Sequence, residues 1–529
     1  MLRSVSVLAV AAVLVTGCTA NSGQGKSGEA TMSPAKGGSM VVAISSEPPS
    51  LNPMTSQVLP TWYVSNQILD TLVKYDSKFK PQPWLAKSWD ISSDGKTYTF
   101  HLRDGVKWSD GKPFSAADVI YTFQEAGPKY SNTYGLIMSK LASLTSSGDE
   151  VTFTFSQPVG AFMSYLGDPN FSILPKHIYE GTDVANNPAN MKPVGTGPFE
   201  LKDWVQGDHL TLVRNPYFWD SSLPKLDRIE FKVVTNPATA IASLQSGAVQ
   251  FVVSDIPPVN AKGLQNSSTV KLASPSVLAR TLDVWFNLRK APFNDLKVRQ
   301  AVSLAVDRTR MVDNIAFGTT KAARSPLGSN SPYFDSTLPV LKRNLSKANK
   351  LLDEAGYPKK SDGTRFSFNL RVSTATDQFV KTAEIVKENL ADVGIDVQVQ
   401  AQENTTTLDA VFKNWDFDAA IYSMPLGPEP SLQLPAWLGQ VGINHAYYSN
   451  AGGYDNPQVD ALAEKAQETV DVTARTKIYD QVQKLIMADL PMVPLWEPTF
   501  ISGYRSTVQN AFTAPDDRYL SFATTSLSK

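Results

Sequence analysis

LAKSWDISSDGKTYTFHLRDGVKWSDGKPFSAADVIYTF, residues 85–123, is the most informative stretch of this sequence. Apolar and polar residues alternate over 97–102, so one face of a strand at these positions can be buried. The Asp-Gly pairs at 94–95 and 110–111 predict turns, because glycine adopts positive φ without steric cost. Ser115 is a good N-cap for the helix predicted after it. The stretch therefore predicts a β-hairpin followed by a capped helix.

The residues of this stretch also carry a family resemblance. Its order of Trp, Asp-Gly, Leu-Arg, Asp-Gly and Trp resembles a signature of the peptide/nickel class of extracellular solute-binding proteins, which deliver ligands to ABC importers. Residues 46–53 (SEPPSLNP), 193–199 (PVGTGPF) and 215–219 (NPYFW) resemble the same family. The resemblance implies a two-lobed, periplasmic-binding-protein-like α/β fold with an extra small subdomain, whose lobes are joined by crossing strands and close on a ligand.

The length of 529 residues exceeds one ordinary hydrophobic core, which agrees with several lobes. We expect a signal peptide (1–17), a lipidated Cys and flexible tether (18–38), lobe I in three parts (39–75, 194–283 and 497–529), a small subdomain of lobe I (76–193) and lobe II (284–496). Patterning predicts strands at 39–44, 151–155, 200–204, 210–214, 229–234, 249–253, 281–287, 366–372 and 395–399, and helices at 60–75, 237–245 and 379–390. Strand, helix and strand in succession indicate an α/β lobe II.

The N-terminal segment has the order of a secretory signal, with a charged start followed by an apolar run over 5–15 that is too short to span a membrane well. Cys18 is the single cysteine, so no intrachain disulfide is possible. Residues 15–18 (VTGC) resemble the bacterial lipobox. That resemblance implies cleavage before Cys18, lipid on its sulfur and an extracytoplasmic protein anchored to the bacterial cell membrane. A free thiol in an uncleaved leader is the alternative.

The sequence shows no catalytic constellation and no cofactor or metal motif. HExxH, GxSxG and CxxC are absent, and the four histidines are scattered. Ser-x-x-Lys patterns at 93–96 and 109–112 lie on the predicted turns, where an active-site helix is not expected. A formal net charge of −1 gives no field that would favour nucleic acid. We therefore expect a binding protein that is not an enzyme, has no cofactor and is a monomer.

The resemblance also bears on the ligand. In peptide-binding members an aspartate on the second lobe holds the free amine of the peptide, three residues before a Glu-Pro or Asp-Pro pair. Here that pair is Glu429-Pro430 and the matching position is Leu426, which cannot hold a charged amine. Either another carboxylate substitutes, with Asp416, Asp418 and Glu429 as candidates, or the ligand lacks a free amine.

Other candidate ligand-binding residues follow from matched positions. The resemblance places Glu47 and Pro48 among first-lobe contacts and residues 422–424 on the backbone rim that pairs with peptide. Trp496 matches an aromatic near the return crossing, and the first crossing is expected over 281–287. The full candidate set is Glu47, Pro48, Trp285, Asn287, Tyr422, Ser423, Met424, Leu426, Trp437 and Trp496, in which Trp285 and Trp437 are chosen from position alone.

Three functions remain open from the sequence. The first is the binding lipoprotein of an ABC importer for peptides or modified peptides, working with permease and ATPase subunits. The second is the same type of protein for an oligosaccharide or another small organic ligand, since aromatic faces also stack on sugar rings. The third is a surface receptor that senses a ligand and feeds no transporter.

Overall fold

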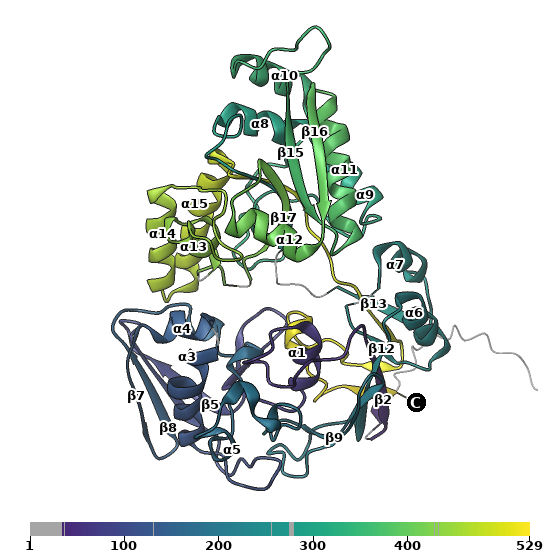
Figure 1. Cartoon of the computed structure of the whole chain (residues 1–529). Helices are drawn as coiled ribbons and strands as arrows, with labels where there is room; N and C mark the ends of the chain where they lie inside the picture. Colours follow the sequence, from purple (N-terminus) through teal and green to yellow (C-terminus); the bar gives the residue numbers. More distant parts are fainter. Residues whose placement is uncertain are drawn as a thin grey trace, which may run out of the picture.

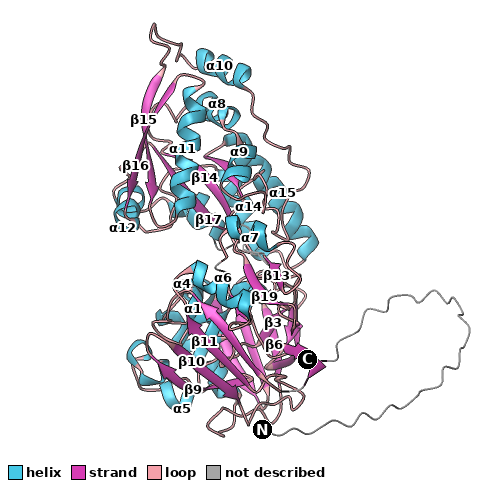
Figure 2. Ribbon diagram, turned by 90° about the vertical axis from the view of Figure 1, so that its right-hand side faces the viewer, coloured by secondary structure: helices cyan, strands magenta, loops and turns pink. Residues whose placement is uncertain are grey.

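The structure is a computed structural model that describes residues 34–528, apart from 36, 131, 255, 275–279, 428 and 432. The predicted signal peptide, Cys18 and nearly all of the tether lie outside the described residues. Two bodies stand one above the other in Figure 1, and Figure 2 shows them joined beside β13 and β19. We call the lower body lobe I and the upper body lobe II. No helix in the described part of the chain is long and apolar enough to cross a membrane.

Lobe I is built on a seven-stranded sheet. Its order is β13 (Val270–Ala273), β19 (Ser502–Arg505), β12 (Phe251–Val252), β2 (Ser39–Ile44), β11 (Arg228–Val233), β10 (His209–Arg214) and β9 (Phe199–Val205). β2 pairs in parallel with β11 and β12, whereas the pairs formed by β10 and β19 are antiparallel. The helices of this part are α1 (Leu59–Ser65), α5 (Lys176–Tyr179), α6 (Pro237–Ser246) and α7 (Pro258–Leu264). Two small sheets complete it, formed by β1 (Pro34–Ala35), β20 (Val508–Gln509) and β21 (Ser526–Ser528), and by β3 (Val73–Tyr75) and β4 (Pro81–Pro83).

The quoted stretch folds as predicted into a β-hairpin followed by a capped helix, within the part of lobe I that we call the small subdomain. A four-stranded antiparallel sheet has the order β5 (Ala86–Ile91), β6 (Thr97–Leu102), β8 (Glu150–Phe155) and β7 (Leu141–Ser147). Gly95 has a φ of 68° in the turn between β5 and β6. Ser115 and Asp118 form a capping box at the start of α2 (Ala116–Ile120), which continues into a π-helical turn, η1 (Tyr121–Ala126), and then α3 (Gly127–Tyr130) and α4 (Asn132–Met138).

Lobe II is an α/β unit on a five-stranded sheet. The order is β16 (Ile395–Gln402), β15 (Phe366–Ser373), β17 (Ala419–Pro425), β14 (Arg280–Phe286) and β18 (Met492–Trp496). β15 pairs in parallel with β16 and β17, and β14 pairs antiparallel with β17 and β18. Its helices are α8 (Leu296–Ala305), α9 (Arg308–Asn314), α10 (Leu345–Glu354), α11 (Asp377–Ala391), α12 (Asn404–Leu408), α13 (Gln433–Leu438), α14 (Pro457–Glu468) and α15 (Val472–Asp489).

The predicted crossings are strands of the structure. β14 enters lobe II from lobe I, and the chain returns from β18 through residues 497–501 to β19. The yellow segment that descends from lobe II to lobe I in Figure 1 is this return. Since β14 pairs with β18, the chain enters and leaves lobe II on adjacent strands of its sheet.

The helix predicted over 60–75 is wrong in its second half. α1 ends at Ser65, and Val73–Tyr75 pairs with Pro81–Pro83 as a strand. The carbonyls of Gln67 and Ile68 accept hydrogen bonds from Phe199 and Gly197 of a distant segment, at 3.0 and 2.8 Å. Because these carbonyls accept hydrogen bonds from a distant segment, they do not accept them from the next turn of a helix. Such long-range contacts leave no trace in the local hydrophobic periodicity.

Candidate functional site

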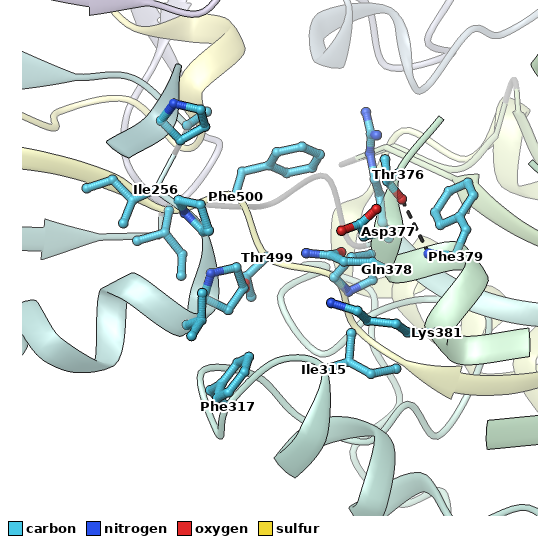
Figure 3. A pocket seen from close by; sticks show the side chains of 18 of the residues that line it. Ile256, Ile315, Phe317, Thr376, Asp377, Gln378, Phe379, Lys381, Thr499 and Phe500 are labelled. Carbon is cyan, nitrogen blue, oxygen red and sulfur yellow. Dashed lines mark hydrogen bonds between the residues drawn. The ribbon is translucent and has the colours of Figure 1, made fainter. Parts of the chain in front are cut away.

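A large cavity lies where the two lobes and their connections meet, and it has a volume of about 600 Å³. Lobe I, lobe II and the return crossing all contribute to its wall. The lining residues are Pro237, Ser254, Ile256, Pro257, Pro258, Val259, Arg280, Ile315, Phe317, Thr376, Asp377, Gln378, Phe379, Lys381, Ser423, Pro498, Thr499, Phe500 and Ile501. In Figure 3, Ile256, Thr499 and Phe500 face Gln378 and Lys381 across the cavity.

The wall of this cavity is mostly apolar, with aromatic and aliphatic side chains from both lobes. Phe317 and Ser254 hold the backbone in the left-handed region, at φ values of 52° and 53°. Non-glycine residues rarely adopt this conformation, and where they do the surrounding structure holds them there. An apolar cavity of this size with a few polar groups is typical of a small-molecule site.

Four polar atoms on this wall are buried and have no hydrogen-bond partner. They are Nε of Arg280 and the hydroxyl oxygens of Ser254, Ser423 and Thr499. A buried polar group without a partner costs free energy, and these four lie on the wall of one cavity, where a bound molecule could supply the missing bonds.

A second cavity of about 140 Å³ also lies between the lobes. Trp62, Asp168 and Arg518 of lobe I line it together with Leu426 and Glu429 of lobe II. Leu426 is fully buried against the core of lobe II. Arg518 pairs with Asp168 at 3.3 Å and lies 5.5 Å from the ring of Trp62. The charged side chains of lobe I in this cavity therefore form an ion pair with each other, while Nε of Arg518 is buried without a hydrogen-bond partner.

Glu429 is also satisfied within the protein. It forms an ion pair of 3.1 Å with Arg475 and accepts hydrogen bonds from the hydroxyls of Tyr333 and Tyr479 at 2.8 and 2.6 Å. Burial, and then the neighbouring Glu429 carboxylate, raise the pKa of Tyr479 well above its usual range, so its hydroxyl keeps its proton. Glu429 has no position left for a ligand amine in this arrangement.

The other two carboxylates considered for amine binding lie away from both cavities. Asp416 pairs with Arg371, and Asp418 pairs with Lys290 at 3.6 Å and accepts from the backbone N–H of Asn369 at 3.0 Å. All three candidate carboxylates therefore have protein partners, and two of them line neither cavity.

The structure brings only part of the predicted site together. Ser423 lines the large cavity and Leu426 the second one. Trp285, Trp437 and Tyr422 pack together in the core of lobe II, where ring centroids are 5.5 Å apart for the two tryptophans and 6.0 Å for Tyr422 and Trp437. Met424 is fully buried in the same core.

The remaining predicted residues make contacts within one lobe. Glu47 accepts from the indole N–H of Trp204 at 2.6 Å, and Pro48 is buried. The side-chain amide of Asn287 donates to the carbonyl of Phe417 at 3.2 Å. Trp496 is fully buried and donates to the hydroxyl of Thr382 at 3.2 Å. None of these four lines either cavity, and their part in ligand binding stays a prediction.

Sequence reasoning missed Arg280, Ser254, Thr499, Phe500 and the start of α11 as cavity residues. Arg280 is the first residue of the crossing strand β14, and residues 498–500 follow β18 directly. The sequence did contain a signal for these residues, which is their position at the ends of the two predicted crossings. A segment that passes from one lobe to the other borders the space between the lobes. In the described part of the chain no group of three His, Cys, Asp or Glu residues could hold a metal ion.

Comparison with known proteins agrees with this architecture. The family model for bacterial extracellular solute-binding proteins, family 5 Middle, matches residues 80–444. The oligopeptide-binding protein AppA of Bacillus subtilis is 30% identical over 94% of this chain and 93% of its own length. The glutathione-binding protein GsiB of Escherichia coli K12 is 29% identical over 90% of this chain and 92% of its own.

Solved structures give the same result. The periplasmic binding protein DppA of Helicobacter pylori, in complex with the peptide STSA, has a TM-score of 0.76 and 26% identity, covering 94% of this chain and 99% of its own. AppA of Bacillus subtilis in complex with a nonapeptide has a TM-score of 0.74 and 27% identity, covering 94% and 100%. The chain therefore belongs to the family 5 extracellular solute-binding proteins, which are binding components of ABC importers and not enzymes.

Proposed function

We propose that this protein captures peptides or modified peptides between its two lobes and delivers them to the permease of an ABC importer. The observation that carries the proposal is the large cavity, to which both lobes and the return crossing contribute. The relatives support the peptide class, since AppA and DppA are solved with a nonapeptide and a tetrapeptide and GsiB is named for glutathione.

We infer that closure of the lobes turns ligand binding into a signal for transport. A ligand in the cavity contacts both lobes at once, so it binds the closed arrangement better than an open one and shifts the population toward it. The connections at β14 and at residues 497–501 act as the hinge. The permease then distinguishes the loaded protein from the empty one by the relative position of the lobes.

The ligand needs no free amine in this proposal. Leu426 stands where a carboxylate would hold the amine, and Asp416, Asp418 and Glu429 have partners within the protein. A buried ammonium without a carboxylate is costly. This observation also favours the second candidate, a small organic ligand or oligosaccharide without an amine, over an ordinary free-amine peptide.

The cellular arrangement is part of the proposal. We infer that the mature protein begins at Cys18 and is held by lipid at the outer face of the bacterial cell membrane. It works as a monomer with the permease and ATPase subunits of the importer. The lobe boundaries predicted from the sequence, with lobe II at 284–496, define the two units that move.

A thermal-shift screen tests the ligand class directly. A ligand present at one hundred times its dissociation constant adds about 2.7 kcal/mol to the free energy of unfolding, which is readily detected. Peptides with free and acetylated amines, oligosaccharides and small organic acids are compared on the purified protein. Stabilisation by peptides supports the proposal, and stabilisation by sugars alone contradicts it. Loss of uptake of the identified ligand in cells that lack the protein separates transport from sensing.

A further inference from the structure

We propose that the large cavity contains a subsite for an anionic group of the ligand, a carboxylate, which is bound by Arg280 together with the hydroxyls of Ser254, Ser423 and Thr499. The inference rests on the proposed function, because it takes this cavity to be the ligand site. It adds the charge of the ligand and the residues that recognise it.

Arg280 is placed for this role by the first crossing. It begins β14, where it pairs with Pro425 of β17, and its guanidinium carbon lies 5.2 Å from the centre of the Phe500 ring on the return crossing. Its Nε is buried without a hydrogen-bond partner, and no ion pair joins it to a carboxylate of the described residues. Arg280 as a whole is half-buried, and an anion in the cavity would supply the partner that its Nε lacks, in a charge-assisted hydrogen bond.

The charges around Arg280 do not neutralise it. Burial lowers the pKa of Arg280, and the neighbouring Arg518 lowers it further, while Asp516 acts in the opposite direction. One oxygen of Asp516 accepts from the backbone N–H of Arg518 at 2.8 Å and the other is buried without a partner. Burial raises the pKa of Asp516, which favours its neutral form and weakens its attraction for Arg280. Of the other charged residues on the wall, Lys381 is positive, and Asp377 is exposed at the start of α11, where solvent weakens its attraction for a cation.

The three hydroxyls add donors of the right kind. Ser254 belongs to lobe I, Ser423 to β17 of lobe II and Thr499 to the return crossing, and the oxygen of each is buried without a partner. Each hydroxyl can donate one hydrogen bond, and a carboxylate accepts through about four lone-pair sites. The planar guanidinium of arginine also matches a carboxylate better than it matches a neutral carbonyl. An anion bound to these groups contacts both lobes and therefore favours closure.

This arrangement predicts that the protein recognises a negatively charged group of its ligand and not a positively charged amine. The position that would recognise a free amine holds Leu426, whereas the large cavity offers Arg280 and hydroxyl donors. A peptide would be recognised by its C-terminal or side-chain carboxylate, and blocking its amine would cost little.

The experiment uses matched pairs in which a carboxylic acid is compared with its amide. The probes are N-acetylated alanine peptides of two to nine residues with a free or amidated C-terminus, and the non-peptide pair adipic acid and adipamide. Calorimetry and thermal shift are run on the wild-type protein, Arg280→Gln, Arg280→Lys and the control Arg310→Gln, whose side chain pairs with Glu388 at the surface of lobe II. Acids are expected to bind at least about tenfold more tightly than amides, as a hydrogen bond to a charged group implies.

Arg280→Gln is expected to remove the preference for acids, Arg280→Lys to keep part of it and Arg310→Gln to leave it unchanged. If Arg280→Gln fails to fold, Ser423→Ala and Arg280→Lys give the test. Equal binding of acids and amides by the wild-type protein overturns the subsite and leaves peptide capture intact. Arg280-dependent binding of adipic acid without any peptide supports the subsite and contradicts peptide capture. No stabilisation by any probe overturns both.

Discussion

Arg475 of lobe II donates a hydrogen bond of 2.9 Å from Nη1 to the carbonyl of Gly160 in the small subdomain of lobe I. The backbone N–H of Gly160 donates in turn to the carbonyl of Gln467 at 2.7 Å. Arg475 is also the ion-pair partner of Glu429, which lines the second cavity. In Figure 1, α14 and α15, which carry Gln467 and Arg475, lie above α3 and α4 on the side away from the yellow return segment. Hydrogen bonds therefore join the two lobes at a place away from the covalent connections between them.

Gly160→Ala is expected to prevent full closure without changing any residue that lines the large cavity. A Cβ at Gly160 would lie 2.1 Å from the carbonyl oxygen of Thr469 in lobe II, so the lobes must separate to accommodate it. Two interlobe hydrogen bonds would be lost, at about 1 kcal/mol each, which corresponds to roughly thirtyfold weaker ligand binding. Calorimetry measures this loss, and X-ray scattering should show a larger radius of gyration for the variant with ligand than for the wild-type protein.

Gly135→Ala is the matched control, because nothing lies within 4 Å of a Cβ at that position in α4. It should bind ligand as the wild-type protein does. The wild-type protein itself should become more compact on binding. Tight binding with no change in the radius of gyration would show that the lobes do not close on the ligand.

The parts of the fold that carry local signals were predicted correctly from the sequence. The strand at Ser39–Ile44, the Asp-Gly hairpin and the capped helix α2 depend on alternation, positive φ and side-chain capping, which neighbouring residues determine. α1 was extended too far because the carbonyls of Gln67 and Ile68 bond to residues about 130 positions later, a contact with no local signal.

Fewer residues of the candidate site than of the fold could be predicted from the sequence. Trp285 and Trp437 were chosen as ligand-facing aromatics, and the structure places both in the core of lobe II. A tryptophan looks the same in a sequence whether its ring covers a ligand or fills a core, since both environments favour large apolar surface. Arg280 and Thr499 become recognisable only when the fold shows that their polar atoms are buried without partners.

Asp283→Asn is expected to stabilise the protein at neutral pH. Asp283 is fully buried on β14; Oδ2 accepts from the hydroxyl of Thr281 at 3.0 Å, and Oδ1 has no partner. Burial raises the pKa of Asp283 well above its ordinary value. The unfolded chain therefore releases this proton at lower pH than the folded protein, so the carboxyl weakens the fold as pH rises above about 4. Asparagine removes that dependence.

Thermal unfolding of the two proteins between pH 3.5 and about 8 checks this sign. The melting temperature of Asp283→Asn should exceed that of the wild-type protein at pH 7, and the difference should shrink toward zero as pH falls through about 4. Asp362→Asn serves as a control, because Asp362 is exposed and its pKa is lowered by hydrogen bonds from Thr364. If the melting temperature of Asp283→Asn minus that of the wild-type protein is smaller at pH 7 than at pH 4, Asp283 does not destabilise the fold by burial of its charge.

Cys18→Ala is expected to abolish membrane attachment. The motive is the lipobox-like segment at residues 15–18, whose single thiol is the proposed acceptor for lipid. Two or more acyl chains anchor a protein stably, so their loss releases it. Detergent-phase partitioning of cell extracts should show the wild-type protein in the detergent phase and the variant as uncleaved precursor or shed protein. An unchanged partition and an unchanged mass of the mature form would show that Cys18 carries no lipid.

Leu426→Asp is expected to shift the preference of the protein toward peptides with a free amine. The wild-type residue is fully buried beside the second cavity, and Glu429 nearby is already paired with Arg475. A new carboxylate there lowers the stability of the unliganded protein by about 2–4 kcal/mol, because it is buried without a partner, and an ammonium group restores it. Calorimetry compares one peptide with and without acetylation on the variant, on Leu426→Met and on the wild-type protein. Acetylation should weaken binding to the aspartate variant only. If it weakens binding to the wild-type protein by about a hundredfold, near 2.7 kcal/mol, an acidic partner for the amine already exists and Leu426 does not set the specificity.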